Sequence, residues 1–134
     1  RRRASSPKLL ALNTGLMTAT ARTTLARAKA DPALWSRLVE TAVGAHLWAH
    51  ADPDELGYWR EGHNEVDWVV RPGKLMRSRD TPTAIVVKTG NPRGTPGTVA
   101  FTHSHRGARS LIVGAGGIPI EQFLSTHPRE WLDS

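Results

Sequence analysis

Two carboxylates and one lysine have the side chains and the chain order that phosphodiester chemistry needs. They are Glu40, Asp67 and Lys88, and each falls in a different segment with regular apolar spacing. Carboxylate oxygens are ligands that Mg²⁺ prefers, and a nearby ammonium can orient or activate water for attack on a phosphodiester. The sequence therefore predicts a magnesium-dependent site, provided that the fold brings these three segments together.

Glu40 lies in the most clearly marked helix of the chain. Asp31 supplies an N-cap and Pro32 a first-turn proline, and apolar residues then recur at helical spacing to about Ala51. Before this helix, residues 7–13 form an apolar run that suits a buried strand, and residues 16–30 have a weakly helical pattern. We expect the long helix to pack beside the strands that carry the other two residues.

Asp67 belongs to the second half of a predicted hairpin. Residues 56–60 and 65–71 form two short strand-like runs, and a four-residue loop at positions 61–64 separates them. Strand alternation assigns the side chains of the second run to two faces. One face is expected to carry Val66, Trp68 and Val70, and the other Glu65, Asp67 and Val69.

Lys88 lies near the end of a third predicted strand at residues 83–89, which is rich in β-branched side chains. If this strand neighbours the hairpin, Asp67 and Lys88 can project from one face of the sheet. Further along, residues 98–102 suit a short strand or a helix turn, residues 110–113 a buried strand, and residues 120–124 a small helix. Together the elements predict an α/β fold, with a mixed sheet flanked by helices.

Six short segments, in this order and spacing, resemble a known family. They are Lys8 to Leu16, Leu38-Val39-Glu40, Tyr58-Trp59-Arg60, Glu65-Val66-Asp67-Trp68, Val86-Val87-Lys88 and Gly116-Gly117-Ile118-Pro119. The family is the C-terminal domain of unknown function that follows the AAA+ core in many prokaryotic P-loop ATPases. Its fold is similar to that of the PD-(D/E)XK nucleases, so the resemblance implies a restriction-endonuclease-like fold.

The resemblance also assigns roles to individual residues. Glu40 matches the helix glutamate, Asp67 the hairpin aspartate, and Lys88 the lysine of the E-x-K strand. Val86 stands where the family has a strand carboxylate, so one oxygen ligand of the implied Mg²⁺ site is missing. Glu65, two residues before Asp67, is the candidate to replace it as a metal ligand, together with Asp67 and Glu40.

The function implied by this pattern is that of an accessory C-terminal domain with a degenerate nuclease-like site, for recognition of DNA or of a partner such as the ATPase domain. Two alternatives remain open. One is a Mg²⁺-dependent endonuclease in which Glu65 serves in place of Val86, and the other is a structural oligomerisation module. A salt-bridged or solvated cluster of the same charged residues is a further interpretation of the pattern.

Length and composition set the broader limits. The 134 residues suit one domain, which we place at residues 7–134 after a polar linker at residues 1–6, and we expect the chain to be a fragment of a larger ATPase. There is no cysteine, which excludes thiolate metal sites and thiol nucleophiles, and no Walker A motif for ATP.

The net charge of +6 is compatible with nucleic-acid binding or with a solvated surface. No apolar run is long enough for a membrane span, so we expect a cytoplasmic protein.

Two histidines in the long helix are spaced as metal ligands often are. His46 and His50 lie four residues apart and share a helix face, but no glutamate follows His46 as the zincin motif requires. We therefore expect packed or capping histidines at these positions.

Overall fold

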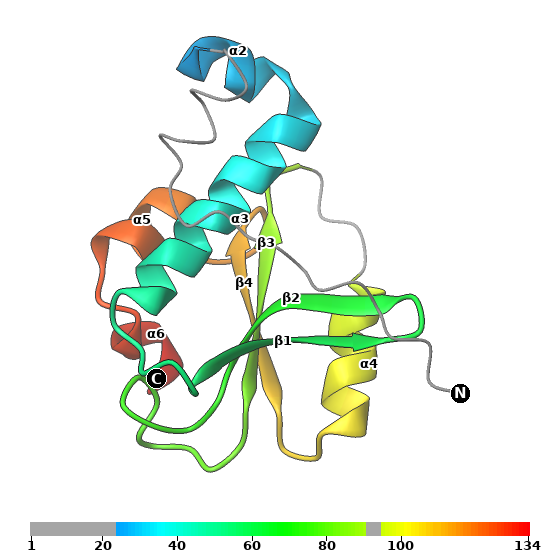
Figure 1. Cartoon of the computed structure of the whole chain (residues 1–134), viewed down its shortest axis with the longest axis vertical. Helices are drawn as coiled ribbons and strands as arrows, with labels where there is room; N and C mark the ends of the chain where they lie inside the picture. Colours follow the sequence, from blue (N-terminus) through cyan, green and yellow to red (C-terminus); the bar gives the residue numbers. More distant parts are fainter. Residues whose placement is uncertain (1–23, 91–94) are drawn as a thin grey trace.

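The protein has an α/β fold, as the sequence predicts. The computed structural model describes residues 24–90 and 95–134, so the expected linker at residues 1–6 and the expected strand at residues 7–13 lie outside the described residues. Within the described part, four strands form one mixed sheet with helices on both of its faces (Figure 1).

The strands lie in the sheet in the order in which they occur along the chain. They are β1 (Leu56–Glu61), β2 (Asn64–Val70), β3 (Thr83–Lys88) and β4 (Arg109–Gly114). β1 and β2 are antiparallel, as are β2 and β3, whereas β3 and β4 are parallel. A parallel pair needs a crossover connection, and here the helix α4 (Pro96–Ser104) provides it.

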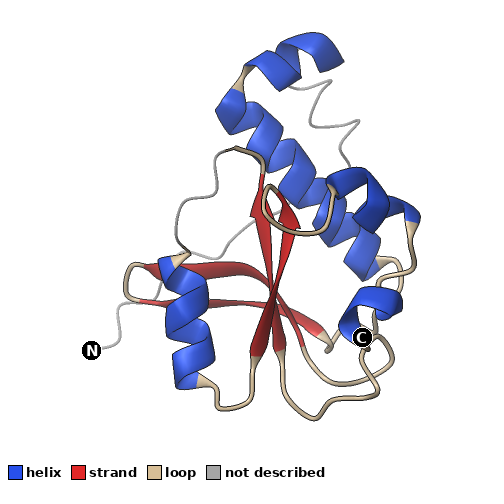
Figure 2. Ribbon diagram, turned by 180° about the vertical axis from the view of Figure 1, so that it is seen from behind, coloured by secondary structure: helices blue, strands red, loops and turns tan. Residues whose placement is uncertain are grey.

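Three helices, α3 (Pro32–Trp48), α5 (Ile120–Ser125) and α6 (Arg129–Leu132), pack on the face of the sheet opposite to α4, and the short α2 (Leu25–Ala30) packs on α3 (Figure 2). The longest, α3, follows α2, and α5 and α6 come last in the chain. The Asp31 carboxylate accepts a hydrogen bond from the Leu34 amide at 3.2 Å, which confirms the predicted cap of α3.

Each face of the sheet has its own apolar cluster. The larger cluster joins α3, α5 and α6 to inward side chains such as Trp68, Val70 and Ile85. The smaller cluster joins Phe101 of α4 to Val66, Val69 and Ala84. The strand β3 thus contributes to both clusters, with Ile85 in the larger and Ala84 in the smaller.

The predicted alternation of β2 is wrong, because the strand contains an extra residue. Gly57 pairs with Val69 and Trp59 with Val66, so two steps along β1 correspond to three steps along β2. Such a β-bulge shifts the face to which the following side chains point. As a result Val66 packs with Val69 on the α4 side, and not with Trp68 and Val70.

Two other predictions need correction. The hairpin turn consists of Gly62 and His63 alone, because Glu61 already pairs with Asn64, and Gly62 takes a φ of 60° that favours glycine. The segment expected at residues 98–102 as a strand or a helix turn is a nine-residue helix, α4. Its start, Thr95 before Pro96, has the residue types of a helix N-terminus.

The loop between β2 and β3 is fixed by two carboxylates. The buried Glu55 side chain accepts hydrogen bonds from the amides of Lys74 and Leu75. At the C-terminal end of α6, Asp133 accepts from the amides of Arg77 (2.8 Å) and Ser78 (3.1 Å). The bond from the Ser78 amide lowers the pKa of Asp133 below its ordinary value.

Candidate functional site

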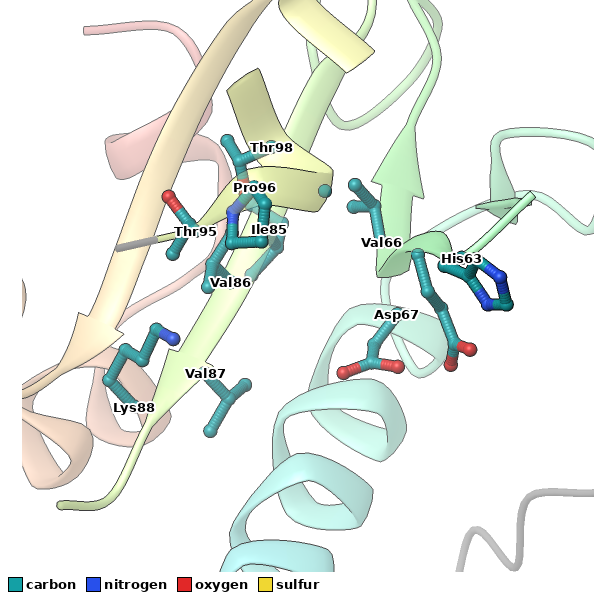
Figure 3. Close-up of a pocket in the computed structure, with 12 residues that line it drawn as sticks. His63, Val66, Asp67, Ile85, Val86, Val87, Lys88, Thr95, Pro96 and Thr98 are labelled. Atoms are coloured by element: carbon teal, nitrogen blue, oxygen red, sulfur yellow. The ribbon is translucent and has the colours of Figure 1, made fainter. Parts of the chain in front are cut away.

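A pocket of about 240 Å³ lies where β2 and β3 separate. The two strands pair over residues 68–70 and 83–85, and β2 then turns away from β3 towards the hairpin (Figure 1). Asp67 of β2 lines one side of the pocket, and Val86 and Lys88 of β3 line the other (Figure 3). Glu65 of β2 also belongs to the lining. The structure thus brings three of the predicted charged residues to one cavity.

Lys88 is the last residue of β3 and is half-buried. Its backbone is held on the β4 side, where it pairs with Gly114 and where the Lys88 carbonyl accepts from the Ala115 amide at 2.9 Å. Gly114 has a φ of 107°, and a side chain there would collide with that carbonyl. The glycine thus allows the close approach that fixes the start of the lysine side chain.

The first turn of α4 forms another wall of the pocket. Residues 95–98 belong to the lining, and Gly97 sits so close to the Glu65 backbone that a Cβ at position 97 would overlap its carbonyl. Helix N-termini carry a partial positive charge. The start of α4 and the Lys88 ammonium therefore both favour an anionic group in the pocket.

Asp67 and Glu65 have the opposite effect on an anion. Asp67 is half-buried and Glu65 is exposed, and both residues belong to the lining. Because the pocket combines these acidic groups with a lysine, it suits a ligand that brings both a negative charge and a cation. A phosphate group with Mg²⁺ is such a ligand, since Mg²⁺ is commonly bound by one or two carboxylates, waters and substrate phosphates.

Glu40 lies on α3 and does not belong to the lining of the pocket. The Glu40 carbonyl on α3 accepts a hydrogen bond from Trp68 Nε1 at 3.2 Å, and Trp68 directly follows Asp67 in β2. Glu40 is half-buried, and the described residues that line the pocket come from β2, the hairpin turn, β3 and the start of α4. The structure therefore shows Glu40 anchoring α3 to β2 through its backbone.

The three predicted metal ligands do not form a three-carboxylate centre. In residues 24–90 and 95–134, no group of three or more histidine, cysteine, aspartate or glutamate side chains has an arrangement that could hold a metal ion. Glu40, Glu65 and Asp67 are all within these ranges. Two of the three, Glu65 and Asp67, line the pocket.

Two parts of the lining were missed at the sequence level. The first turn of α4 forms one wall, and its Thr95-Pro96 signature is a recognisable helix start. His63 from the hairpin turn forms another part of the lining, and nothing in the local sequence distinguishes it from an ordinary exposed turn residue.

No helix in the described part of the chain combines the length and the apolar character needed to cross a membrane. Comparison of the sequence with models of protein families, with curated proteins and with solved structures finds no match. The resemblance to the nuclease-like domain of prokaryotic ATPases therefore stays a prediction, and the case for a function rests on the geometry of the pocket.

Proposed function

We propose that this chain is a nucleic-acid-binding accessory domain of a larger prokaryotic ATPase, with a restriction-endonuclease-like fold and a degenerate nuclease site. The observation that carries the proposal is the convergence of Asp67 and Lys88, 21 positions apart in the sequence, on one pocket between β2, β3 and the start of α4. A mixed sheet with α3 on one face and α4 on the other supports the fold.

The charges of the pocket suggest how a nucleic-acid backbone binds there. Lys88 and the N-terminus of α4 attract a phosphate, whereas Asp67 and Glu65 repel it. A Mg²⁺ ion held by Asp67 and Glu65 would offset that repulsion and draw electron density from the phosphoryl oxygens. We therefore expect Mg²⁺ to strengthen binding.

Val86 is the reason for proposing recognition in place of cleavage. It lines the same pocket as Asp67 and Lys88, and its side chain has no oxygen to bind a metal ion (Figure 3). Catalysis requires its reacting groups to be held within about 0.5 Å of the productive geometry. A site without one metal ligand still has the charges that bind a phosphate, but it no longer holds the metal ion in the geometry that cleavage requires.

Lys88→Ala is expected to weaken binding of a mixed-sequence DNA oligonucleotide about tenfold and to lower the salt dependence of binding by about one phosphate contact. The physical reason is that the ammonium no longer displaces a counterion from the backbone. Fluorescence anisotropy at several salt concentrations, with and without Mg²⁺, measures both effects. Lys74→Ala is the matched control, because this exposed lysine lies within 4.0 Å of Asp52 and outside the pocket lining.

Equal losses in the two lysine variants would mean that net charge, and not the pocket, determines binding. If the chain has no salt-dependent affinity for nucleic acid and sediments as a stable oligomer, the structural oligomerisation role replaces the proposal.

A second candidate is a Mg²⁺-dependent endonuclease, favoured by the presence of Glu65 in the same lining as Asp67 and Lys88. It predicts nicking of supercoiled plasmid in Mg²⁺ or Mn²⁺ that disappears in Asp67→Asn, in Lys88→Ala and in Glu65→Gln. Nicking that persists in these variants would indicate a contaminating nuclease. If the chain produces no nicking at all, the endonuclease candidate is excluded and only the nucleic-acid-binding role stands.

A further inference from the structure

A second, more open hollow of about 470 Å³ adjoins the pocket that contains Lys88. It is formed by α4 and the start of β2, and its lining residues are Asn64, Thr95, Pro96, Val99, Ala100 and His103. Thr95 and Pro96 belong to the linings of both cavities, and Asn64 directly follows His63 of the Lys88 pocket. The two cavities are therefore neighbours that meet at the start of α4.

The hollow presents apolar surface that the fold leaves exposed. α4 buries Thr98 and Phe101, and Phe101 packs on the sheet. A different face of the helix carries Pro96, Val99 and His103, whose spacing of three and then four residues aligns them in one stripe. Val99 is 65% exposed. An apolar group of a ligand that enters the hollow can therefore contact this stripe.

The chemistry of the hollow differs from that of the Lys88 pocket. Among the residues that the structure describes, its lining contains no carboxylate, lysine or arginine. Val99 offers apolar surface, and the His103 imidazole offers a flat ring on which a base can stack. The Asn64 side-chain amide can both donate and accept hydrogen bonds. An uncharged ligand with apolar faces and a polar edge suits this lining, and a nucleobase is such a ligand.

We propose that the hollow takes a nucleobase of the strand whose phosphate occupies the Lys88 pocket, so that the domain binds single-stranded nucleic acid in preference to a duplex. The inference rests on the proposed function, because the hollow has this role only if a phosphate binds beside it. Each nucleotide joins an anionic phosphate to an apolar base, which matches a charged pocket next to an apolar hollow.

The pairing state of the nucleic acid decides whether a base can reach the hollow. In a duplex the base faces are stacked on one another, and only the base edges are accessible, in the grooves. In a single strand the bases can be splayed out and stacked on protein side chains. Because such stacking tolerates any base, we expect little sequence preference.

Fluorescence anisotropy of the full chain in Mg²⁺ and physiological salt, with three labelled DNA probes of equal length, tests the inference. The probes are a mixed-sequence single strand, its duplex, and a strand in which abasic units replace all the nucleosides. The abasic strand keeps the phosphates but has no base for the hollow. The wild type is expected to bind the normal single strand about tenfold more tightly than the abasic strand, and also more tightly than the duplex.

Val99→Ser and His103→Ala should each weaken binding of the normal single strand about fivefold and should change binding of the abasic strand by less than about twofold. Both side chains are exposed, so neither variant removes a core contact. Leu25→Ser is the matched control for Val99→Ser, because Leu25 is a similarly exposed apolar residue, at 61%, on α2 and outside both linings. It should leave the affinity for all three probes unchanged.

Lys88→Ala separates this inference from the proposed function, because it should weaken binding of all three probes. If the wild type binds the normal and abasic strands equally well and Lys88→Ala still weakens both, the phosphate site stands and the base site is refuted. The base site is also refuted if Val99→Ser weakens the abasic strand as much as the normal strand. If no probe binds with a salt-dependent affinity, the proposed function and this inference both fail.

Discussion

Glu55→Ala is expected to destabilise the protein by about 2–4 kcal/mol, more than any other single carboxylate replacement that we propose. The Glu55 side chain is 4% exposed and accepts from three backbone amides, those of Asp52 at 2.7 Å, Lys74, and Leu75 at 3.3 Å. Alanine would leave these donors without their acceptor, and the Leu75 donor is buried. Urea unfolding followed by circular dichroism measures the loss.

The loop that Glu55 organises explains the size of the effect. It places Leu75 and Met76, both fully buried, in the larger apolar cluster. Glu55→Gln keeps one acceptor oxygen and should lose only about 1 kcal/mol. Glu61→Ala, at the exposed end of β1, should change the stability by less than about 0.5 kcal/mol. Equal stability of Glu55→Ala and Glu61→Ala would show that the carboxylate does not hold the loop.

Gly44→Ala should destabilise the protein by about 1–3 kcal/mol, although the same change in an unconstrained helix stabilises by about 1 kcal/mol. The reason is that a Cβ at position 44 would overlap the indole of Trp68, which is 6% exposed and cannot move away easily. The ring is also tied to α3 by its hydrogen bond to the Glu40 carbonyl. Thermal unfolding of the variant tests the sign directly.

A double-mutant cycle isolates the clash. In a Trp68→Leu background the indole is gone, so Gly44→Ala should cost little or should stabilise α3 through its better helix propensity. If Gly44→Ala destabilises both backgrounds equally, close packing on Trp68 is not the cause. Because Trp68 follows Asp67, a loss of nucleic-acid affinity in Gly44→Ala would further link this packing to the pocket.

Local signals in the sequence were sufficient where one segment determines its own structure. The Asp31 cap and Pro32 locate the start of α3, and the β-branched run at residues 83–88 locates β3. Both signals act over one turn or one strand. These elements, and the mixed sheet that they imply, are confirmed.

The incorrect predictions concern features that depend on contacts between different segments of the chain. The bulge in β2 arises from its pairing with β1, and a period-two pattern contains no trace of the additional residue. The α4 helix is short and has few apolar residues at helical spacing, so its packing through Phe101 on Val66 and Ala84 was not visible in advance. Tertiary contacts decide both outcomes.

At the candidate site, too, the local pattern predicted some features and contacts between segments determined the others. The order of Asp67 and Lys88 predicted that they would meet, and the structure places both at one pocket. The reason is the separation of β2 from β3, which alternation along a single strand could not predict. Glu40 was expected to add its carboxylate, but its observed link to β2 is a backbone hydrogen bond to Trp68.

The most direct test of the account is a map of amide chemical-shift changes when a mixed-sequence DNA oligonucleotide is added to the isotope-labelled chain in Mg²⁺. We predict that the changes centre on Asp67, Lys88 and the first turn of α4, and that Lys88→Ala needs about tenfold more DNA to produce them. Shift changes confined to other surfaces, with the amides of Lys88, Gly97 and Thr98 unaffected, would contradict a nucleic-acid site between β2 and β3.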